Sequence, residues 1–168
     1  MDENTLTIIL IEPQLGQNIG AVARAMLNFG LTDLRIVNPR DGWPNPEALP
    51  SAAGADEILE NAKIYTSTLE AIGDLNRLFA TSNRTPDMIK SIYTPALALQ
   101  QLVSTAQQGQ KVGILFGGER CGLRNEEISL CEAIIRIPTS ENFSSLNLAH
   151  AVVIIAHEWF AQTASSPF

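Results

Sequence analysis

Three short segments of this sequence carry the residue types that could bind a ligand and act on it. The first is Gln14–Gly20 leading into Arg24, the second is Gly117–Leu123, and the third is Pro138–Asn147, with its Asn and Ser side chains. Each follows a stretch that favours a β-strand. Because ligands of open α/β sheets bind where strands end at their carboxyl edge, each of the three segments is a candidate ligand-binding loop.

The second segment, Gly117-Gly118-Glu119-Arg120-Cys121-Gly122-Leu123, is rich in glycine without being a known phosphate-binding signature. Its glycines do not spell G-x-G-x-x-G, and it lacks the Lys-Ser/Thr of a P-loop. Glycine lets the backbone approach a ligand closely or turn with positive φ. Taken alone, this loop fits a ligand cradle and a structural turn about equally well.

Arg24 lies in an otherwise apolar helical segment of small residues, between Val22-Ala23 and Ala25-Met26. No neighbouring carboxylate can neutralise it. Two interpretations are open: a surface arginine whose stem covers apolar neighbours, or a fixed cation aimed at an anionic or developing-anion group.

Metal and hydrolase chemistry find little support. His150 and His157 are seven residues apart on one helix, and there is no H-E-x-x-H. Packing is the better interpretation of both histidines, and we expect no metal. Ser144 and Ser145 lack the surroundings of a nucleophile elbow, which argues against a hydrolase triad.

Alternating strands and helices must position these segments. Apolar runs and turn residues predict strands at Thr7–Glu12, Leu34–Val37, Ile64–Tyr65, Leu78–Ala80, Lys111–Phe116 and Ile134–Ile137. Helices are predicted at Ile19–Phe29, capped by Asn18 and stopped by Gly30, at Ser51–Asn61, from Thr94-Pro95 to about Gln107, and at Ser145–Thr163. The pattern indicates an α/β fold with a parallel sheet flanked by helices. We expect one domain over residues 1–163 and a loose tail over 164–168.

Composition indicates a globular chain: 45% of its residues are hydrophobic and 17% are charged. No apolar run approaches the ~20 residues of a membrane span, and the N-terminus lacks the pattern of a signal peptide. Two thiols without a C-x-x-C, Cys121 and Cys131, fit a reducing cytoplasm. The net charge of −7 means that nucleic acid cannot be held by bulk charge alone, and it also suits an ordinary small-molecule enzyme.

The last helix is apolar nearly all round. Leu146, Ala149, Val152, Val153 and Ala156 form one stripe, and Leu148, Ala151, Ile155 and Trp159 form another. Only one stripe can face the sheet of so small a domain, and soluble monomers avoid large apolar patches. We therefore expect the second stripe to pair with another copy in a homodimer; the alternative is a core helix that its own chain covers on both sides.

Taken together, the three segments resemble the signatures of the SpoU/TrmH (SPOUT-class) RNA 2′-O-methyltransferase family. Asn18-Ile19-Gly20 through Gly30 resembles the first signature, Phe116-Gly117-Gly118-Glu119 through Leu123 the second, and Ile137-Pro138 with Ser145-Leu146-Asn147-Leu148-Ala149 the third. Their order and separations also fit, and the resemblance covers nearly the whole chain.

The resemblance implies a parallel α/β sheet whose C-terminal part is tied in a deep trefoil knot, and S-adenosyl-L-methionine (SAM) as methyl donor. The residues that match the SAM site of the family are Thr81, Ser82, Asn83, Gly117, Ile137, Ser144, Ser145 and Leu146. The position of Asn83 is often alanine in the family, a departure expected to change little.

The resemblance also implies a catalytic set. Arg24 matches the family's essential arginine; because a guanidinium stays protonated in proteins, we expect it to stabilise a developing alkoxide or hold the adjacent phosphate. Asn18, Glu119 and Asn147 match further signature positions. They are expected to orient Arg24 and the ribose, including across a dimer interface.

Within the family, the sequence most resembles members that methylate the first nucleotide of the tRNA anticodon loop. The supporting segments are Arg24-Ala25-Met26, Val37-Asn38-Pro39, Ala52-Ala53-Gly54-Ala55, Thr81-Ser82-Asn83-Arg84 and Ser144-Ser145-Leu146-Asn147-Leu148. Such members usually continue into a C-terminal RNA-binding extension, whereas this sequence ends at Phe168, so weak, salt-dependent tRNA affinity is expected. Alternatives are methylation of rRNA or another tRNA position, a SAM- or RNA-binding module without turnover, and an enzyme for an anionic small molecule.

Overall fold

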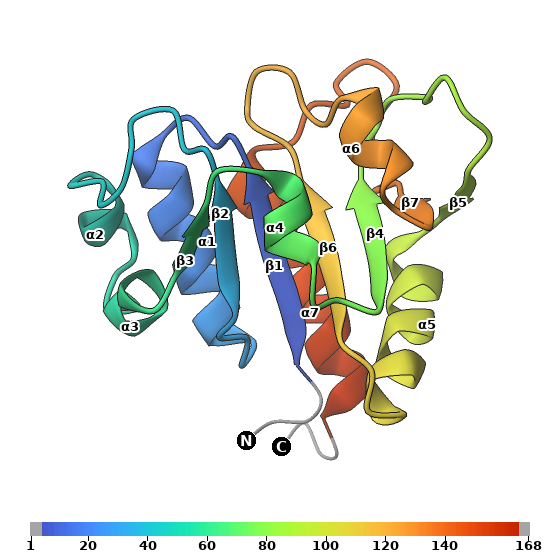
Figure 1. Ribbon diagram of the computed structural model, residues 1–168, viewed down its shortest axis with the longest axis horizontal. Helices are drawn as coiled ribbons and strands as arrows, with labels where there is room; N and C mark the ends of the chain where they lie inside the picture. The colour runs from blue at the N-terminus through green and yellow to red at the C-terminus, as the bar shows by residue number, and fades with distance from the viewer. Residues whose placement is uncertain (1–4, 165–168) are drawn as a thin grey trace.

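Short strands, buried within the sheet and largely exposed at its two edges, build a seven-stranded parallel sheet in the computed structural model, which describes residues 5–164 (Figure 1). The strands are β1 (Leu6–Ile11), β2 (Leu34–Val37), β3 (Lys63–Tyr65), β4 (Arg77–Thr81), β5 (Ser91–Tyr93), β6 (Val112–Phe116) and β7 (Ala133–Ile135). Their order across the sheet is β3-β2-β1-β6-β4-β7-β5. The neighbours β4, β6 and β7 come from distant parts of the chain, so their carboxyl ends bring the second and third segments together.

Helices cover both faces of the sheet, and a separate hydrophobic core lies on each face. The side chains of β1 alternate between these two cores. Leu6, Ile8 and Leu10 belong to the larger core, which includes α1 (Gly16–Asn28), α2 (Ala48–Ser51), α3 (Asp56–Glu60), α5 (Pro95–Gln107) and α7 (Leu148–Thr163). Ile9 and Ile11 belong to the smaller core, with α4 (Thr68–Ile72) and α6 (Asn125–Ser129). The predicted parallel sheet with helices on both faces is confirmed.

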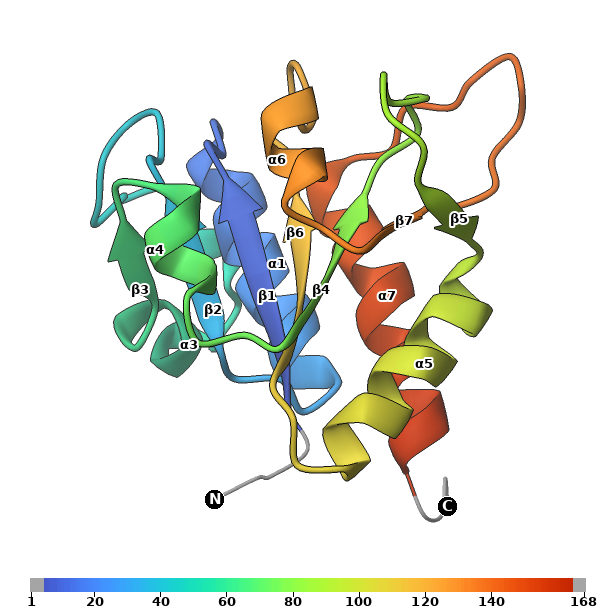
Figure 2. The same ribbon diagram turned by 45° about the vertical axis from the view of Figure 1, so that its right-hand side comes forward.

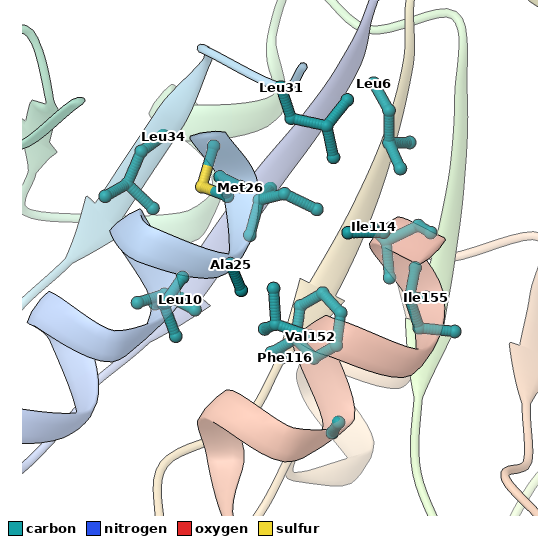
Figure 3. Close-up of a cluster of buried hydrophobic side chains, with 14 of the residues drawn as sticks. Leu6, Leu10, Ala25, Met26, Leu31, Leu34, Ile114, Phe116, Val152 and Ile155 are labelled. Carbon is teal, nitrogen blue, oxygen red and sulfur yellow. The ribbon is translucent and has the colours of Figure 1, made fainter. Parts of the chain in front are cut away.

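The last helix, α7, is buried on two sides within its own chain. It packs between α1 and α5 (Figure 2), and Figure 3 shows Val152 and Ile155 in the core beside Phe116 and Ile114. The stripe assigned to a dimer partner is already covered, with exposed fractions of 6% or less for Leu148, Ile155 and Trp159 and 9% for Ala151. The expectation that this stripe faces a second copy is wrong, because α5 supplies the second wall that the helix needs.

The structure differs from the sequence-based prediction at two helix caps and at several short helices and strands. Asn18 lies inside the first turn of α1, whose N-cap is Leu15, so its side chain is available for contacts elsewhere. Ser51 ends α2 and donates its hydroxyl to the carbonyl of Ala48, so it does not cap a helix to Asn61. Four short elements, α2, α4, β5 and α6, were not predicted. The expected loose tail falls mostly on residues 165–168, outside the described residues.

Across residues 5–164, no helix combines the length and apolar character needed to cross a membrane.

Candidate functional site

A cavity of about 330 Å³ opens at the carboxyl ends of β4 and β6, on the upper edge of the sheet in Figure 1. The segment after β4, the glycine loop after β6 and the loop leading to α7 form its walls. All eight residues expected to hold SAM line it: Thr81, Ser82, Asn83, Gly117, Ile137, Ser144, Ser145 and Leu146. The structure thus gathers into one cavity residues that are up to 65 positions apart in the sequence.

The glycine loop is both a turn and a close approach of backbones. A Cβ at Gly117 would overlap the backbone of Gly122 and Leu123, and one at Gly118 would lie 2.6 Å from the carbonyl oxygen of Glu12. Gly122 has a φ of +63°, where side chains other than glycine are strained. The loop therefore folds back on itself against the end of β1, and its backbone forms one wall of the cavity.

One polar side chain in the cavity wall has no hydrogen-bond partner among the described residues, and another links two of the walls. The hydroxyl oxygen of Thr81 is buried and has no hydrogen-bond partner among the described residues. The Asn83 amide donates to the carbonyl oxygen of Ser144 at 2.8 Å, which ties the first wall to the third. Because buried polar groups are normally hydrogen-bonded, an orphaned hydroxyl in a cavity wall fits a site for a polar ligand.

Beside the cavity, Glu119, Asn18 and Asn147 form one hydrogen-bond chain between the glycine loop, α1 and α7. The Asn18 amide donates to Glu119 Oε2 at 3.0 Å, and the Asn147 amide donates to Asn18 Oδ1 at 3.0 Å. The Oδ1 of Asn147 accepts from the backbone N–H of Ala149 at 2.8 Å as the N-cap of α7. All three signature segments are thus joined by three side chains.

Glu119 also clamps the loop that begins α1. Its two carboxylate oxygens accept backbone N–H groups from Gln14 at 2.9 Å and Leu15 at 2.7 Å. Burial raises the pKa of this carboxyl, but the hydrogen bonds from Asn18, Leu15 and Gln14 together outweigh it and hold the pKa below its ordinary value. Glu119 is therefore a carboxylate at neutral pH that accepts hydrogen bonds and positions two loops.

Replacing Glu119 with glutamine is expected to reduce the free energy of unfolding by about 1–3 kcal/mol, because one donor would then face an N–H instead of an oxygen. Since the folded pKa is depressed, the carboxylate's contribution is present above the ordinary carboxyl pKa and is lost as pH falls through the folded value. Urea unfolding of both proteins at neutral and acidic pH measures this. The difference should shrink in acid, and Glu126→Gln, on the exposed side of α6, should cost little. Equal stability of Glu119→Gln and the parent at neutral pH would contradict this role.

Arg24 lies apart from this arrangement. It is exposed on α1, does not line the cavity, and makes no hydrogen bond or ion pair with any residue in the described range 5–164. Within one chain, Asn18, Glu119 and Asn147 bond to one another and to backbone and do not orient Arg24. Its guanidinium therefore has no partner among the described residues and can contact a ligand or another molecule.

Other arginines divide into two groups. Arg35, Arg40, Arg77 and Arg124 form ion pairs with carboxylates. Arg84 and Arg120 line the cavity, and Arg136 donates to the carbonyl oxygen of Arg84; none of these three has an ion pair within the described part of the chain. These three arginines could not be grouped from the sequence, because Arg84, Arg120 and Arg136 are dispersed along the chain and converge only in the fold.

The two histidines make no common site. His150 and His157 are exposed on α7, and the His157 ring meets Phe29 edge-on at 5.5 Å between centroids. In the described range, no three His, Cys, Asp or Glu side chains are grouped so that they could hold a metal ion.

Comparisons with known proteins agree on one family. A family model described as the SpoU rRNA Methylase family matches residues 5–157. The chain is 39% identical to the tRNA (cytidine-2′-O-)-methyltransferase TrmJ of Methanocaldococcus jannaschii over 97% of this chain and 70% of that protein. It is 36% identical to the tRNA (cytidine/uridine-2′-O-)-methyltransferase TrmJ of Sodalis glossinidius over 92% of this chain and 60% of that one. The chain thus spans between 60% and 70% of the length of these two relatives.

Solved structures give the same result. The crystal structure of TrmJ from Z. mobilis ZM4 superposes with a TM-score of 0.88 at 49% identity, over 93% of this chain and 68% of that one. The fold also matches the SpoU methyltransferase AviRb from Streptomyces viridochromogenes, solved in complex with AdoMet, with a TM-score of 0.78 at 22% identity over 99% of this chain and 60% of that one.

Proposed function

The chain belongs to the SpoU rRNA methylase family, and from this we propose that it is the catalytic domain of a SAM-dependent tRNA 2′-O-ribose methyltransferase that acts on the first nucleotide of the anticodon loop. The observation that carries the proposal is the convergence of the three signature segments on one cavity, joined by Glu119, Asn18 and Asn147. The relatives named TrmJ supply the expectation of a tRNA substrate and a ribose target.

The cavity suits SAM in size and chemistry. Ligand cavities begin at about 300 Å³, and this one holds about 330 Å³ between apolar and polar walls. The orphaned Thr81 hydroxyl offers a hydrogen bond to the ligand. Gly117 lets the glycine loop fold back closely enough to form its wall of the cavity, because any side chain there would collide with the loop's own backbone. The eight lining residues already named are proposed to hold the donor, and no metal is needed for this chemistry.

SAM, when bound, supplies an activated methyl group, so the chain's own residues mainly have to align the ribose and control charge. Glu119, Asn18 and Asn147 fix the edges of the cavity relative to one another. Arg24, which stays protonated, is proposed to stabilise the oxygen that loses its proton or to hold the adjacent phosphate. Bringing the reacting groups into line is itself worth several kcal/mol of the barrier.

RNA contact is proposed at the cavity mouth. The chain carries a net charge of −7, so it cannot attract RNA uniformly. Arg84, Arg120 and Arg136 lack carboxylate partners there among the described residues, and they give this part of the surface cations that phosphates can approach. The location of these arginines supports an RNA path across the mouth of the SAM cavity.

A homodimer is proposed through a different surface from the one first expected. Leu27 of α1 and Val153, Ile154 and Phe160 of α7 are each between 37% and 43% exposed, and they form what we term the α1–α7 face. The Phe29 ring lies 6.0 Å from that of Phe160, which shows that the two helices meet there. Arg24 is on the exposed side of α1, one turn from Leu27. Because Arg24 is exposed and lies outside its own cavity, we propose that it serves the cavity of a second copy bound on this face.

Substitutions at the adjacent residues Ile154 and Ile155 test whether this dimer forms. Ile154→Asp, on the α1–α7 face, is expected to fold normally and sediment as an inactive monomer. Ile155→Asp buries a carboxylate in the core and should lose about 4 kcal/mol or more of stability. Sedimentation and urea unfolding separate the outcomes. A parent protein that is an active monomer at micromolar concentration would refute the dimer.

Two finer features are part of the same proposal. The deep trefoil knot is supported by family membership and by the return of α7 from β7 to a position between α1 and α5. A cytoplasmic location is supported by the two thiols, which form no disulfide.

The substrate is tested by mapping 2′-O-methyl groups in RNA from cells with and without this protein. We expect the modification to disappear from the first anticodon-loop nucleotide of at least one tRNA. An unchanged map, or a loss confined to rRNA, would contradict the tRNA assignment.

A further inference from the structure

Phe143 is the most exposed aromatic side chain in the described range. It is 78% exposed, whereas Phe160, the next most exposed phenylalanine, is 43% exposed. A large apolar side chain in water forgoes the stabilisation that burial would give it, roughly 1.5–3 kcal/mol. A single exposed apolar residue is ordinary on a surface. A role for Phe143 must therefore be argued from its position in the fold and from the residues around it.

The segment that carries Phe143 is a tied turn. The backbone N–H of Phe143 donates to the carbonyl oxygen of Ser140 at 3.2 Å, and these two residues form an antiparallel bridge. Within the turn, the N–H of Asn142 donates to the hydroxyl of Ser140 at 3.3 Å. The next residue, Ser144, accepts the Asn83 amide through its carbonyl oxygen and lines the cavity. Phe143 is therefore held in solvent directly beside the cavity wall.

The charges around the cavity mouth indicate the chemistry of the partner. Arg84 and Arg120 line the cavity without ion pairs, and Arg136 adjoins Arg84. Phe143 thus adjoins, through Ser144, a cavity that Arg84 and Arg120 also line. An exposed ring and arginines at one site are the combination by which proteins hold single-stranded nucleic acid: cations track phosphates and a ring stacks on a base. A protein partner would more often bury an aromatic residue within a larger apolar patch, whereas the residues flanking Phe143 are Glu141, Asn142, Ser144 and Ser145.

We propose that Phe143 is a stacking platform for a nucleobase of the RNA segment that carries the methylated ribose. This inference rests on the proposed function and deepens it, since it assigns a base contact at a residue outside the expected catalytic and SAM sets. Because every base has a π-face, such a contact adds affinity and orientation with little base preference.

Steady-state methylation of a tRNA anticodon stem-loop by four variants tests the proposal. Phe143→Ala should lower kcat/KM for RNA by between about 5-fold and about 150-fold, the range for loss of one base–aromatic stack. Phe143→Leu, which keeps apolar bulk without a π-face, should fall close to alanine, and Phe143→Trp should retain parental activity. Leu69→Ala removes a side chain that is 66% exposed on α4 and serves as the matched control; it should leave kcat/KM unchanged.

Two further measurements make the result unambiguous. SAM affinity, measured by calorimetry without RNA, should be the same in Phe143→Ala and the parent. The tryptophan fluorescence of Phe143→Trp, compared with that of the parent, should be quenched by the stem-loop. The proposal is overturned if Phe143→Ala retains parental kcat/KM on RNA, or if it loses SAM affinity, which would mean that the ring covers the donor. Absence of methylation by the parent protein would instead refute the proposed function.

Discussion

Replacing Arg24 with alanine is expected to lower the rate of methyl transfer by about 100- to 1000-fold, the usual loss when one fixed donor to a developing oxyanion is removed. SAM affinity should stay within about twofold of the parent value, because Arg24 does not line the cavity. Stability should also be unchanged, since the side chain is exposed and makes no hydrogen bond or ion pair within residues 5–164. Single-turnover kinetics with saturating SAM, together with calorimetry, measure both quantities.

Lys63→Ala is the matched control for Arg24, because it removes the same charge from an exposed position on β3, at the far edge of the sheet. It should leave turnover intact. If Arg24→Ala kept more than a tenth of parental turnover, Arg24 would be an ordinary surface arginine, the other interpretation that its surroundings allow.

Replacing Gly117 with alanine is expected to abolish measurable SAM binding, a loss of at least about 100-fold, or about 2.7 kcal/mol. The added Cβ would overlap the backbone of Gly122 and Leu123, so the glycine loop would have to open and the cavity wall would move. The loop contributes only Leu123 to the smaller core and nothing to the larger one, so the protein should remain folded. Calorimetry with SAM, with circular dichroism to confirm the fold, measures the effect.

Gly109→Ala controls for a generic effect of replacing glycine. Gly109 has a φ of +83°, but a Cβ there would meet no atom within 4 Å. This variant should lose some stability through backbone strain and retain full SAM affinity. Parental SAM affinity in Gly117→Ala would refute the assignment of the cavity to the donor.

Long elements with strong local signals were predictable from the sequence. The helix from Thr94-Pro95 to Gln107 is confirmed as α5, with Thr94 accepting from the backbone N–H of Leu97. The strand Leu34–Val37 is confirmed residue for residue as β2. The missed elements α2, α4, β5 and α6 have between three and five residues, too few to establish a periodic pattern.

Tertiary contacts explain the remaining differences. Asn18 is a good helix cap by residue type, yet its amide bonds to Glu119, 101 residues away, and the helix begins earlier. The stripe that includes Ile155 is covered by α5, and no local pattern shows which helices will be neighbours. A spatial cluster such as Arg84, Arg120 and Arg136 likewise becomes visible only when the strands are ordered. The SAM residues were named from the family resemblance, and the structure gathers them around one cavity.

The most direct test of the central claim is methyl transfer by the purified chain. Unmodified tRNA would be incubated with SAM labelled in its methyl group, digested to nucleosides and analysed by mass spectrometry, with Arg24→Ala in parallel. We predict a labelled 2′-O-methylnucleoside from the first position of the anticodon loop and almost none with Arg24→Ala. Label on a base instead of the ribose, or no transfer although SAM binds, would contradict the account.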